Sequence, residues 1–181
     1  YNNALNQNSC KAWTDCLAGQ VIAHNGTTTT DRQCADCVTG AFTSAKNQHK
    51  CISWTHCEPG QMITHNGTIT SDRQCAACVG SYNNALNQNS CKAWTDCLPG
   101  QMIMHNGTTT ADRQCAACVI EAFTSAKNQY SCKLWTHCLP GQMITHNGTT
   151  TTDRQCAACA TGALTSAKNQ YSCKLWTHCL P

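Results

Sequence analysis

Cysteine is the residue that most constrains this chain: 18 of its 181 residues are cysteine, and they recur at a nearly fixed spacing. Between successive cysteines lie 5, 17, 2 and then 12 or 13 residues, and the cycle then repeats. Such a density is typical of secreted modules held by disulfides, which persist in an oxidising environment. The sequence therefore predicts an extracellular or cell-surface protein.

The aliphatic and phenylalanine content is too low for an ordinary hydrophobic core. Leu, Ile, Val and Phe together make up 22 of 181 residues, about 12%, and chains below about 20% tend to remain disordered. The cysteines are what remains to stabilise a fold. Because the 12 basic and 9 acidic residues are scattered singly, a nucleic-acid partner is not expected. No apolar run approaches the 18 to 20 or so residues that span a bilayer.

Five tryptophans mark an internal repeat, with steps of 41, 40, 41 and 41 residues. A fixed period of this length indicates a tandem array of small modules. Two variants occur: units one and three open with YNNALNQNSCKAWTDC, and the others carry SAKNQ and WTHC. The predicted units are 1–40, 41–81, 82–121, 122–162 and a partial fifth, 163–181.

Within a unit, the pair Asn25-Gly26 predicts a tight hairpin. A two-residue type I′ turn needs positive φ at both central positions, which Asn-Gly tolerates. The flanking stretches QVIAH and TTTTDRQ are rich in β-branched residues and predict the two strands. A disulfide between Cys16 and Cys34 would close the base of this hairpin. The expected fold class is small and disulfide-rich, mostly β-hairpin and loop.

The stretches CKAWTDCLAGQVIAHNGTTTTDRQC and CVTGAFTSAKNQHKC carry the patterns C-x-x-W-T-x-C…D-R-x-C and C-x-x-G-x-F/Y. They resemble the cysteine-rich repeats of tumour necrosis factor receptors, across all four full units and the partial one. The resemblance implies an elongated ectodomain of disulfide modules placed end to end. Many repeats of that family have six cysteines and each unit here has four, so no ligand-binding residue is carried over.

The resemblance also implies a disulfide pairing in which linker bonds such as Cys37–Cys51 alternate with hairpin bonds such as Cys57–Cys75. Extended along the chain, it leaves Cys10 and Cys179 unpaired or bonded to another subunit, as expected for a window cut from a longer array. A local pattern with Cys10–Cys16 bonds remains open. The pairs implied by the resemblance are Cys16–Cys34, Cys37–Cys51, Cys57–Cys75, Cys78–Cys91, Cys97–Cys115, Cys118–Cys132, Cys138–Cys156 and Cys159–Cys173.

Metal and catalytic sites are not expected. The recurring C-x₂-C could supply half of a zinc site, but the other cysteine pair of each unit is separated by five residues. The histidines beside Asn-Gly have no acidic cluster or nucleophile near them in sequence, so they are interpreted as solvated side chains. The tryptophans are interpreted as packing residues rather than ligand contacts. We therefore expect no cofactor, no metal site and no enzymatic activity.

Each Asn-Gly is followed by Thr, which completes the N-glycosylation pattern N-x-T. The alternative is that Asn-Gly is present only for the turn. Exposed turns of a secreted chain favour attached glycans. The candidate sites are Asn25, Asn66, Asn106 and Asn147.

Near-identity of the repeats leads to the functional hypothesis. Nearly identical side chains in successive repeats favour regular contacts between copies, so the sequence favours an extracellular structural protein. We expect a glycan-coated rod that forms or belongs to a filament or surface fibre through axial self-contacts. The alternative is a receptor-like ectodomain that binds a protein ligand.

Overall fold

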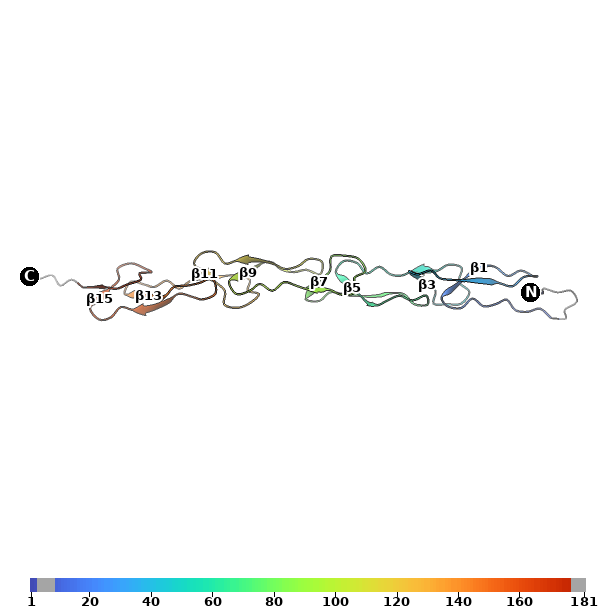
Figure 1. Cartoon of the computed structure of the whole chain (residues 1–181), viewed down its shortest axis with the longest axis horizontal. Coiled ribbons are helices and arrows are strands. Elements are labelled where there is room, and N and C mark those ends of the chain that lie inside the picture. The colour runs from blue at the N-terminus through green and yellow to red at the C-terminus, as the bar shows by residue number, and fades with distance from the viewer. Residues whose placement is uncertain (3–8, 177–181) are drawn as a thin grey trace, which may run out of the picture. The chain divides into compact units, whose positions relative to one another are not determined.

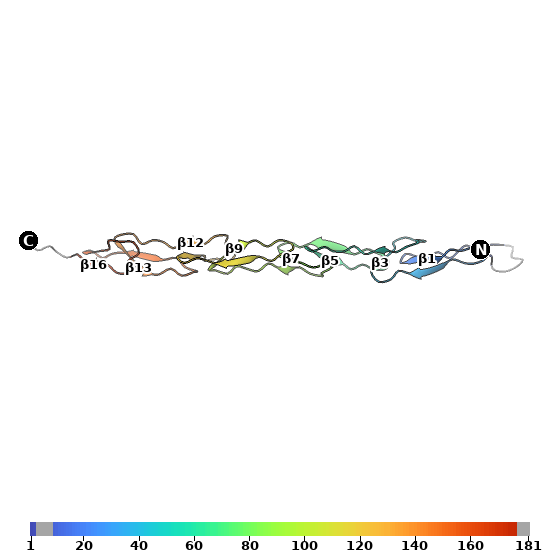
Figure 2. The ribbon, with the colours of Figure 1, turned by 90° about the horizontal axis from the view of Figure 1, so that it is seen from above.

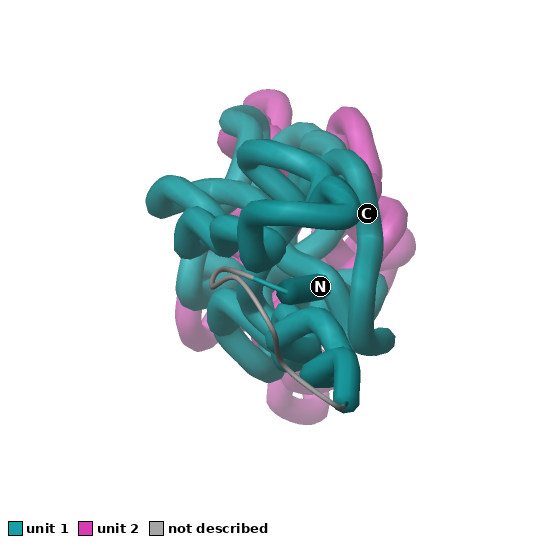
Figure 3. Tube along the Cα trace, turned by 90° about the vertical axis from the view of Figure 1, so that its right-hand side faces the viewer, with its two compact units in different colours: residues 1–92, 109–111 teal, residues 93–108, 112–181 magenta. Residues whose placement is uncertain are grey.

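The computed structural model of the chain describes residues 1–2 and 9–176. It divides into two compact units, coloured separately in Figure 3: residues 1–92 with 109–111, and residues 93–108 with 112–181. The described residues contain β-strands and loops and no helix. This confirms the expected class of a small, disulfide-rich protein built from hairpins in tandem modules.

Each module contains one long hairpin. In the first, β1 pairs antiparallel with β2, and the register shifts between Ile22 and His24. The equivalent hairpins repeat the same bulged register. Their bounds are Gln20–His24 (β1) with Gln33–Asp36 (β2), Gln61–His65 (β5) with Gln74–Ala77 (β6), Gln101–His105 (β9) with Gln114–Ala117 (β10), and Gln142–His146 (β13) with Gln155–Ala158 (β14).

A short two-stranded ribbon follows each hairpin. Long hairpins and short ribbons alternate in chain order within each unit, from β1 to β7 in the first and from β9 to β15 in the second (Figure 1 and Figure 2). The short ribbons are Ala41–Phe42 (β3) with Ile52–Ser53 (β4), Ser81–Tyr82 (β7) with Lys92–Ala93 (β8), Ala122–Phe123 (β11) with Lys133–Leu134 (β12), and Ala163–Leu164 (β15) with Lys174–Leu175 (β16).

The tight turn predicted at Asn25-Gly26 is wrong. β1 ends at His24, which pairs with Gln33, so residues 25–32 form a longer loop. Neither Asn25 nor Gly26 belongs to the positive-φ residues of the described chain, which excludes a type I′ turn. The threonines predicted to form the second strand instead form a turn, because the Thr27 hydroxyl accepts hydrogen bonds from the amides of Thr29 and Thr30. Such side-chain bonds compete with strand pairing.

The loop that links two hairpins folds back on the hairpin before it. The amide of Ile22 donates to the carbonyl of Gln48 at 2.8 Å, and the amide of Asn47 donates to the carbonyl of Cys16 at 2.8 Å. Asn47 has a φ of 59°, a left-handed conformation that asparagine tolerates better than most residues. Each linker loop is thereby part of the module that precedes it.

The threonine-rich hairpin loop of one module contacts a glycine corner of the module before it. In the first unit, Gly60 donates to the carbonyl of Asn83 at 2.7 Å, and Asn83 donates to the carbonyl of Thr109 at 2.9 Å. A Cβ at Gly60 would lie 2.9 Å from the Thr109 hydroxyl, so only glycine permits this approach. Gly19 and Gly100 make the equivalent contact with the loops that carry Ile69 and Thr150.

The buried residues are mostly cysteines and short polar side chains. The first cysteine of each hairpin bond has no exposed surface, and Thr43 is 2% exposed. The hydroxyl of Thr43 accepts a hydrogen bond from the Gly19 amide at 2.8 Å. The interior of each module is thus a disulfide with hydrogen-bonded polar groups around it, as the low aliphatic content requires.

Candidate ligand-binding surface

Eight disulfides form the frame of the described chain, and each module contributes two. One closes the long hairpin and the other closes the linker loop. In the structure Cys16 is bonded to Cys34, so the local alternative with a Cys10–Cys16 bond is not formed. The bonds are Cys16–Cys34, Cys37–Cys51, Cys57–Cys75, Cys78–Cys91, Cys97–Cys115, Cys118–Cys132, Cys138–Cys156 and Cys159–Cys173.

Cys10 is free and exposed, and Cys179 lies outside the described residues. The C-x₂-C cysteines are all bonded to other partners, so they offer no thiolate pair. Residues 1–2 and 9–176 contain no group of three or more acidic, histidine or cysteine side chains placed to hold a metal ion. The same residues include no helix long and apolar enough to cross a membrane.

In each of the four full modules the tryptophan packs on a glycine of the hairpin loop. The indole nitrogen of Trp13 donates to the carbonyl of Thr27 at 3.0 Å, and a Cβ at Gly26 would lie 2.5 Å from that nitrogen. The guanidinium of Arg32 lies over the same ring, 5.6 Å from its centre. A cation over an indole contributes about 0.5–1 kcal/mol at an exposed site. The ring is therefore a packing element between loop and arginine.

An aspartate ties the segment that carries the tryptophan to the hairpin loop. Asp31 accepts hydrogen bonds from the hydroxyl of Thr14 at 2.7 Å and from the Thr14 amide at 2.8 Å. It also accepts one from the amide of Arg32 at 2.7 Å. The hydroxyl bond and the amide bond from Thr14 lower the pKa of Asp31 from its usual 3.8 to about 2, because both stabilise the charged form.

The arginine beside that aspartate joins the hairpin to the linker loop. Arg32 donates to the carbonyl of Thr14 at 3.1 Å and to Oδ1 of Asn47 at 2.6 Å. The same Asn47 oxygen accepts the amide of Cys16 at 2.9 Å. Sequence analysis assigned no role to the Asp-Arg pair or to this asparagine. Their recurrence in every full unit was the available signal.

These contacts, which we call the lock, recur in the other modules, with one difference among the described residues. Arg73 and Arg113 donate to Asn87 and Asn128 as Arg32 does to Asn47, whereas Arg154 donates to Thr136 and Asn147 and not to Asn169. The members of the lock are the Trp, Thr, Asp and Arg of the hairpin and the Asn of the linker loop, joined by the equivalent hydrogen bonds and ring contacts. The sets are Trp54, Thr55, Asp72, Arg73 and Asn87; Trp94, Thr95, Asp112, Arg113 and Asn128; Trp135, Thr136, Asp153, Arg154 and Asn169.

The four candidate glycosylation asparagines are all exposed on the hairpin loops, one per module. Their structural surroundings differ slightly. The side-chain oxygens of Asn106 and Asn147 accept hydrogen bonds from the Nε of Arg113 and Arg154 at 3.5 and 3.4 Å. The histidine before each of these asparagines is exposed as well.

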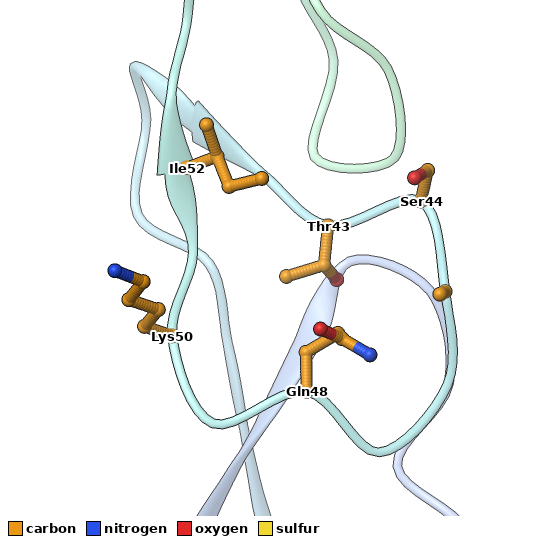
Figure 4. A pocket seen from close by; sticks show the side chains of 6 residues that line it. Thr43, Ser44, Gln48, Lys50 and Ile52 are labelled. Carbon is orange, nitrogen blue, oxygen red and sulfur yellow. The ribbon is translucent and has the colours of Figure 1, made fainter.

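A small depression recurs on the linker loops, shown for the first module in Figure 4. Its lining there includes Thr43, Gln48, Lys50 and Ile52. The equivalent depressions involve the same loop positions in other modules. No acidic or histidine side chain accompanies the lysine among these lining residues, and a feature repeated on every loop belongs to the fold.

The linker ribbon of the third module has one exposed apolar side chain that the others lack, Ile120. Ile120 is 92% exposed, Leu134 is 71% exposed and Val119 is 69% exposed. They lie on the turn before β11 and on β12, which pairs Ala122 with Leu134. The equivalents of Val119 and Leu134 in other modules are exposed as well, since Val38 is 75%, Val79 is 89% and Leu175 is 80% exposed. At the position of Ile120 two other modules have threonine, and the remaining one is a residue shorter. We call Val119, Ile120 and Leu134 the contact ribbon.

Backbone strain accompanies this ribbon. Glu121 has a φ of 63° where the other modules have a glycine at positive φ. A left-handed conformation costs a non-glycine residue about 1–2 kcal/mol. Its carboxylate lies 3.5 Å from the guanidinium of Arg154, whose side chain is only 4% exposed. Sequence analysis missed this position, although the replacement of Val-Thr-Gly by Val-Ile-Glu was visible.

Comparison with protein families gives one match that covers most of the chain. The model of the TNFR/NGFR cysteine-rich region matches four times, and the second and fourth matches each contain one linker disulfide and one hairpin disulfide. The matched residues are 1–34, 37–75, 79–115 and 118–156. The unit bounds inferred from the tryptophans stay a prediction.

Similar solved structures include a chain of the human RANKL/OPG complex, which is 21% identical with a TM-score of 0.37. The match covers 82% of this chain and 91% of that one. A chain of the mouse RANKL-OPG complex is 20% identical with a TM-score of 0.34, covering 68% of this chain and 90% of that one. A comparison with curated proteins found no match.

The family match overturns the expected filament. The hypothesis of a structural rod with axial self-contacts is wrong, because four consecutive stretches match the cysteine-rich region of receptors. The physical error lies in the interpretation of the copied residues. They are the cysteines, glycines and lock residues that build the module, and their identity is explained without a lattice.

Proposed function

The chain belongs to the TNFR/NGFR cysteine-rich family, and we propose that it is a receptor-like ectodomain whose ligand is another protein. The observation on which this proposal rests is the family match over four consecutive stretches. As a disulfide-rich member of that family, the chain is extracellular or displayed at the cell surface.

The separation between constant internal residues and variable exposed residues within a module supports this proposal. Tryptophan, threonine, aspartate, arginine and asparagine hold the hairpin to the linker loop, and they are the same in every full module. The lock leaves the exposed positions of the loops free to vary. A scaffold of constant internal contacts with variable exposed positions is suited to recognition, because binding residues are commonly carried on loops held by a rigid frame.

The contact ribbon is the surface at which the proposal places the ligand. Ile120 is almost fully in solvent and Leu134 is largely exposed. Exposed apolar side chains grouped on one element often mark protein interaction sites. Full burial of an Ile or Leu side chain against a ligand contributes about 1.5–3 kcal/mol, so two such contacts would account for a substantial share of a micromolar affinity.

The proposal assigns no catalytic step to the chain. The hydroxyls of the depressions on the linker loops have no histidine or acidic side chain beside them among their lining residues, so a nucleophile, base and orienting group are not assembled there. A nucleophile without a base and an orienting partner is weak. Binding is therefore the whole of the proposed activity.

The experiment is a binding screen against purified proteins of the two ligand classes that the family's name contains, tumour necrosis factors and nerve growth factors. The secreted, disulfide-bonded chain is immobilised and each protein is passed over it. We expect saturable binding by at least one protein, lost when the chain is reduced. Failure of every panel member to bind at micromolar concentration would contradict the proposal.

A further inference from the structure

The asparagine of each Asn-Gly-Thr tripeptide is not required by the backbone. The glycine has a structural reason, since the tryptophan ring occupies the space of a Cβ. The threonine has one as well, because its hydroxyl accepts amide hydrogen bonds that form the loop. Asn25, in contrast, has neither a positive φ nor a tight turn to form. The structural alternative to glycosylation, an asparagine kept for its turn, is thereby removed.

The side-chain environment orients the carboxamide. In two modules the asparagine Oδ1 accepts a hydrogen bond from the Nε of the lock arginine. In the other two, the Nε atoms of Arg32 and Arg73 are buried without a hydrogen-bond partner. A carboxamide of Asn25 or Asn66 turned as in the other two modules would direct its oxygen toward this Nε. In Asn106 and Asn147 the oxygen is the atom held by the arginine, which leaves the nitrogen as the atom available for modification.

We propose that Asn25, Asn66, Asn106 and Asn147 are N-glycosylated. The bond formed joins Nδ2 of asparagine to the first carbon of an oligosaccharide carried on a lipid pyrophosphate. The bond broken is the sugar–phosphate bond, the lipid pyrophosphate leaves with its electron pair, and one proton leaves the amide nitrogen. The carbonyl oxygen is unchanged, so the hydrogen bond from the arginine persists in the product.

A glycan on Asn106 is compatible with the contact that its Nδ2 makes. Nδ2 of Asn106 lies 3.5 Å from the hydroxyl of Tyr130, and a glycosylated asparagine retains one N–H for that bond. The asparagines lie on the hairpin loops, whereas the contact ribbon lies on a linker ribbon. The inference does not depend on the proposed ligand.

The test is secretion of the full chain from an animal cell line, followed by enzymatic deglycosylation in heavy-oxygen water. Removal of an N-glycan converts asparagine to aspartate and incorporates the heavy oxygen, which peptide mass spectrometry locates. We expect the label at all four positions. A correctly disulfide-bonded product with no label at any of them would overturn the proposal, and an unlabelled single position would remove that site.

Matched variants separate the sequon from the loop structure. Thr27→Ser keeps both the hydroxyl that caps the loop and the glycosylation pattern, so we expect the label at Asn25 to remain. Asn25→Gln keeps a carboxamide but removes the pattern, so the glycan at this position should be lost without loss of secretion. Retention of the same glycan mass in Asn25→Gln would overturn the assignment.

Discussion

At the residue scale, each full module packs an indole ring directly on a glycine of its hairpin loop. A Cβ at Gly107 would lie 2.5 Å from the ring of Trp94, a distance at which the ring must move. The ring nitrogen would then lose its bond to the carbonyl of Thr108, now 2.8 Å long. From sequence alone the Asn-Gly pair predicts a turn. The structure instead explains its glycine by the packing of the indole ring.

Gly107→Ala is expected to expose the indole N–H of Trp94 to solvent. Loss of the stacking and of the hydrogen bond together lowers the free energy that protects this N–H by about 1.4 kcal/mol or more. This corresponds to about tenfold faster hydrogen exchange. Exchange of the indole proton followed by nuclear magnetic resonance measures it. Gly80→Ala is the control, because its Cβ meets nothing within 4 Å among the described residues and only its φ of +62° is strained. Equal protection of Trp94 in both variants would contradict this role of Gly107.

The carboxylate of Asp31 gives the lock a pH dependence. Its pKa in the folded chain, about 2, lies below the usual 3.8, so the bonds to Thr14 stabilise the lock above pH 4. This stabilisation is lost as the pH falls through about 2, where the carboxylate is protonated. Thr14→Val removes the hydroxyl donor and is expected to raise the pKa of Asp31 toward its usual value, measured by carbon-13 titration. Thr55→Val, which acts on Asp72, should leave Asp31 unchanged; an unaltered Asp31 in Thr14→Val would show that the hydroxyl is not the cause.

At the element scale, a glycine corner and a threonine loop join successive modules. In the second unit, Gly100 faces the loop that contains Thr150, and the amide of Thr124 donates to the Thr150 carbonyl at 3.1 Å. Gly141 occupies the same corner in the next module, but no described residue lies within 4 Å of the place of its Cβ. The two corners share a φ near +85°. Substitutions at Gly100 and Gly141 can therefore be compared to measure what the contact with the threonine loop contributes.

Gly100→Ala and Gly141→Ala carry the same backbone strain, about 1–2 kcal/mol. Only Gly100→Ala adds a contact at 3.1 Å with the Thr150 hydroxyl. We expect faster amide exchange at Thr124 in Gly100→Ala than in Gly141→Ala, measured by nuclear magnetic resonance. Identical amide exchange at Thr124 in the two variants would mean that the threonine loop does not restrict the space at Gly100.

The disulfide pairing belongs to the same scale. Peptide mapping without reduction is expected to recover Cys16 bonded to Cys34 and Cys37 bonded to Cys51, as in the structure. Closure of a hairpin of this length contributes about 3 kcal/mol in the chain-entropy model, which a two-stranded hairpin needs because it is marginal alone. A peptide that joins Cys10 to Cys16 would contradict the pairing.

Sequence patterns predicted the modular, disulfide-rich hairpin fold because cysteine spacing and period do not depend on side-chain environment. They failed where a tertiary contact decides the local structure. Asn25-Gly26 predicts a turn by propensity, yet the indole of Trp13 and the hydroxyl of Thr27 determine the loop. The contact ribbon was missed for a related reason, since exposure of Ile120 cannot be read from the sequence. Glu121 was the detectable departure, a non-glycine residue at a glycine position.

At the scale of the whole molecule, the central claim is that the modules are a constant frame on which one ribbon binds a protein ligand. In this account the repeated residues build the frame, and Ile120, which no other module carries at its position, completes the exposed apolar surface of the contact ribbon. Ile120 and Leu134 can be exchanged for residues that other modules carry at the same positions, threonine and serine. Such exchanges change the surface and leave the disulfides and the lock in place.

The most direct test compares the affinity of the panel ligand for Ile120→Thr/Leu134→Ser with its affinity for the matched variant Thr39→Ser, measured by surface plasmon resonance. Thr39 lies on the equivalent turn of the first module. The account predicts a Kd at least about tenfold weaker for the double variant, equivalent to about 1.4 kcal/mol, and an unchanged Kd for Thr39→Ser. Unaltered binding by the double variant would contradict the placement of the ligand on the contact ribbon.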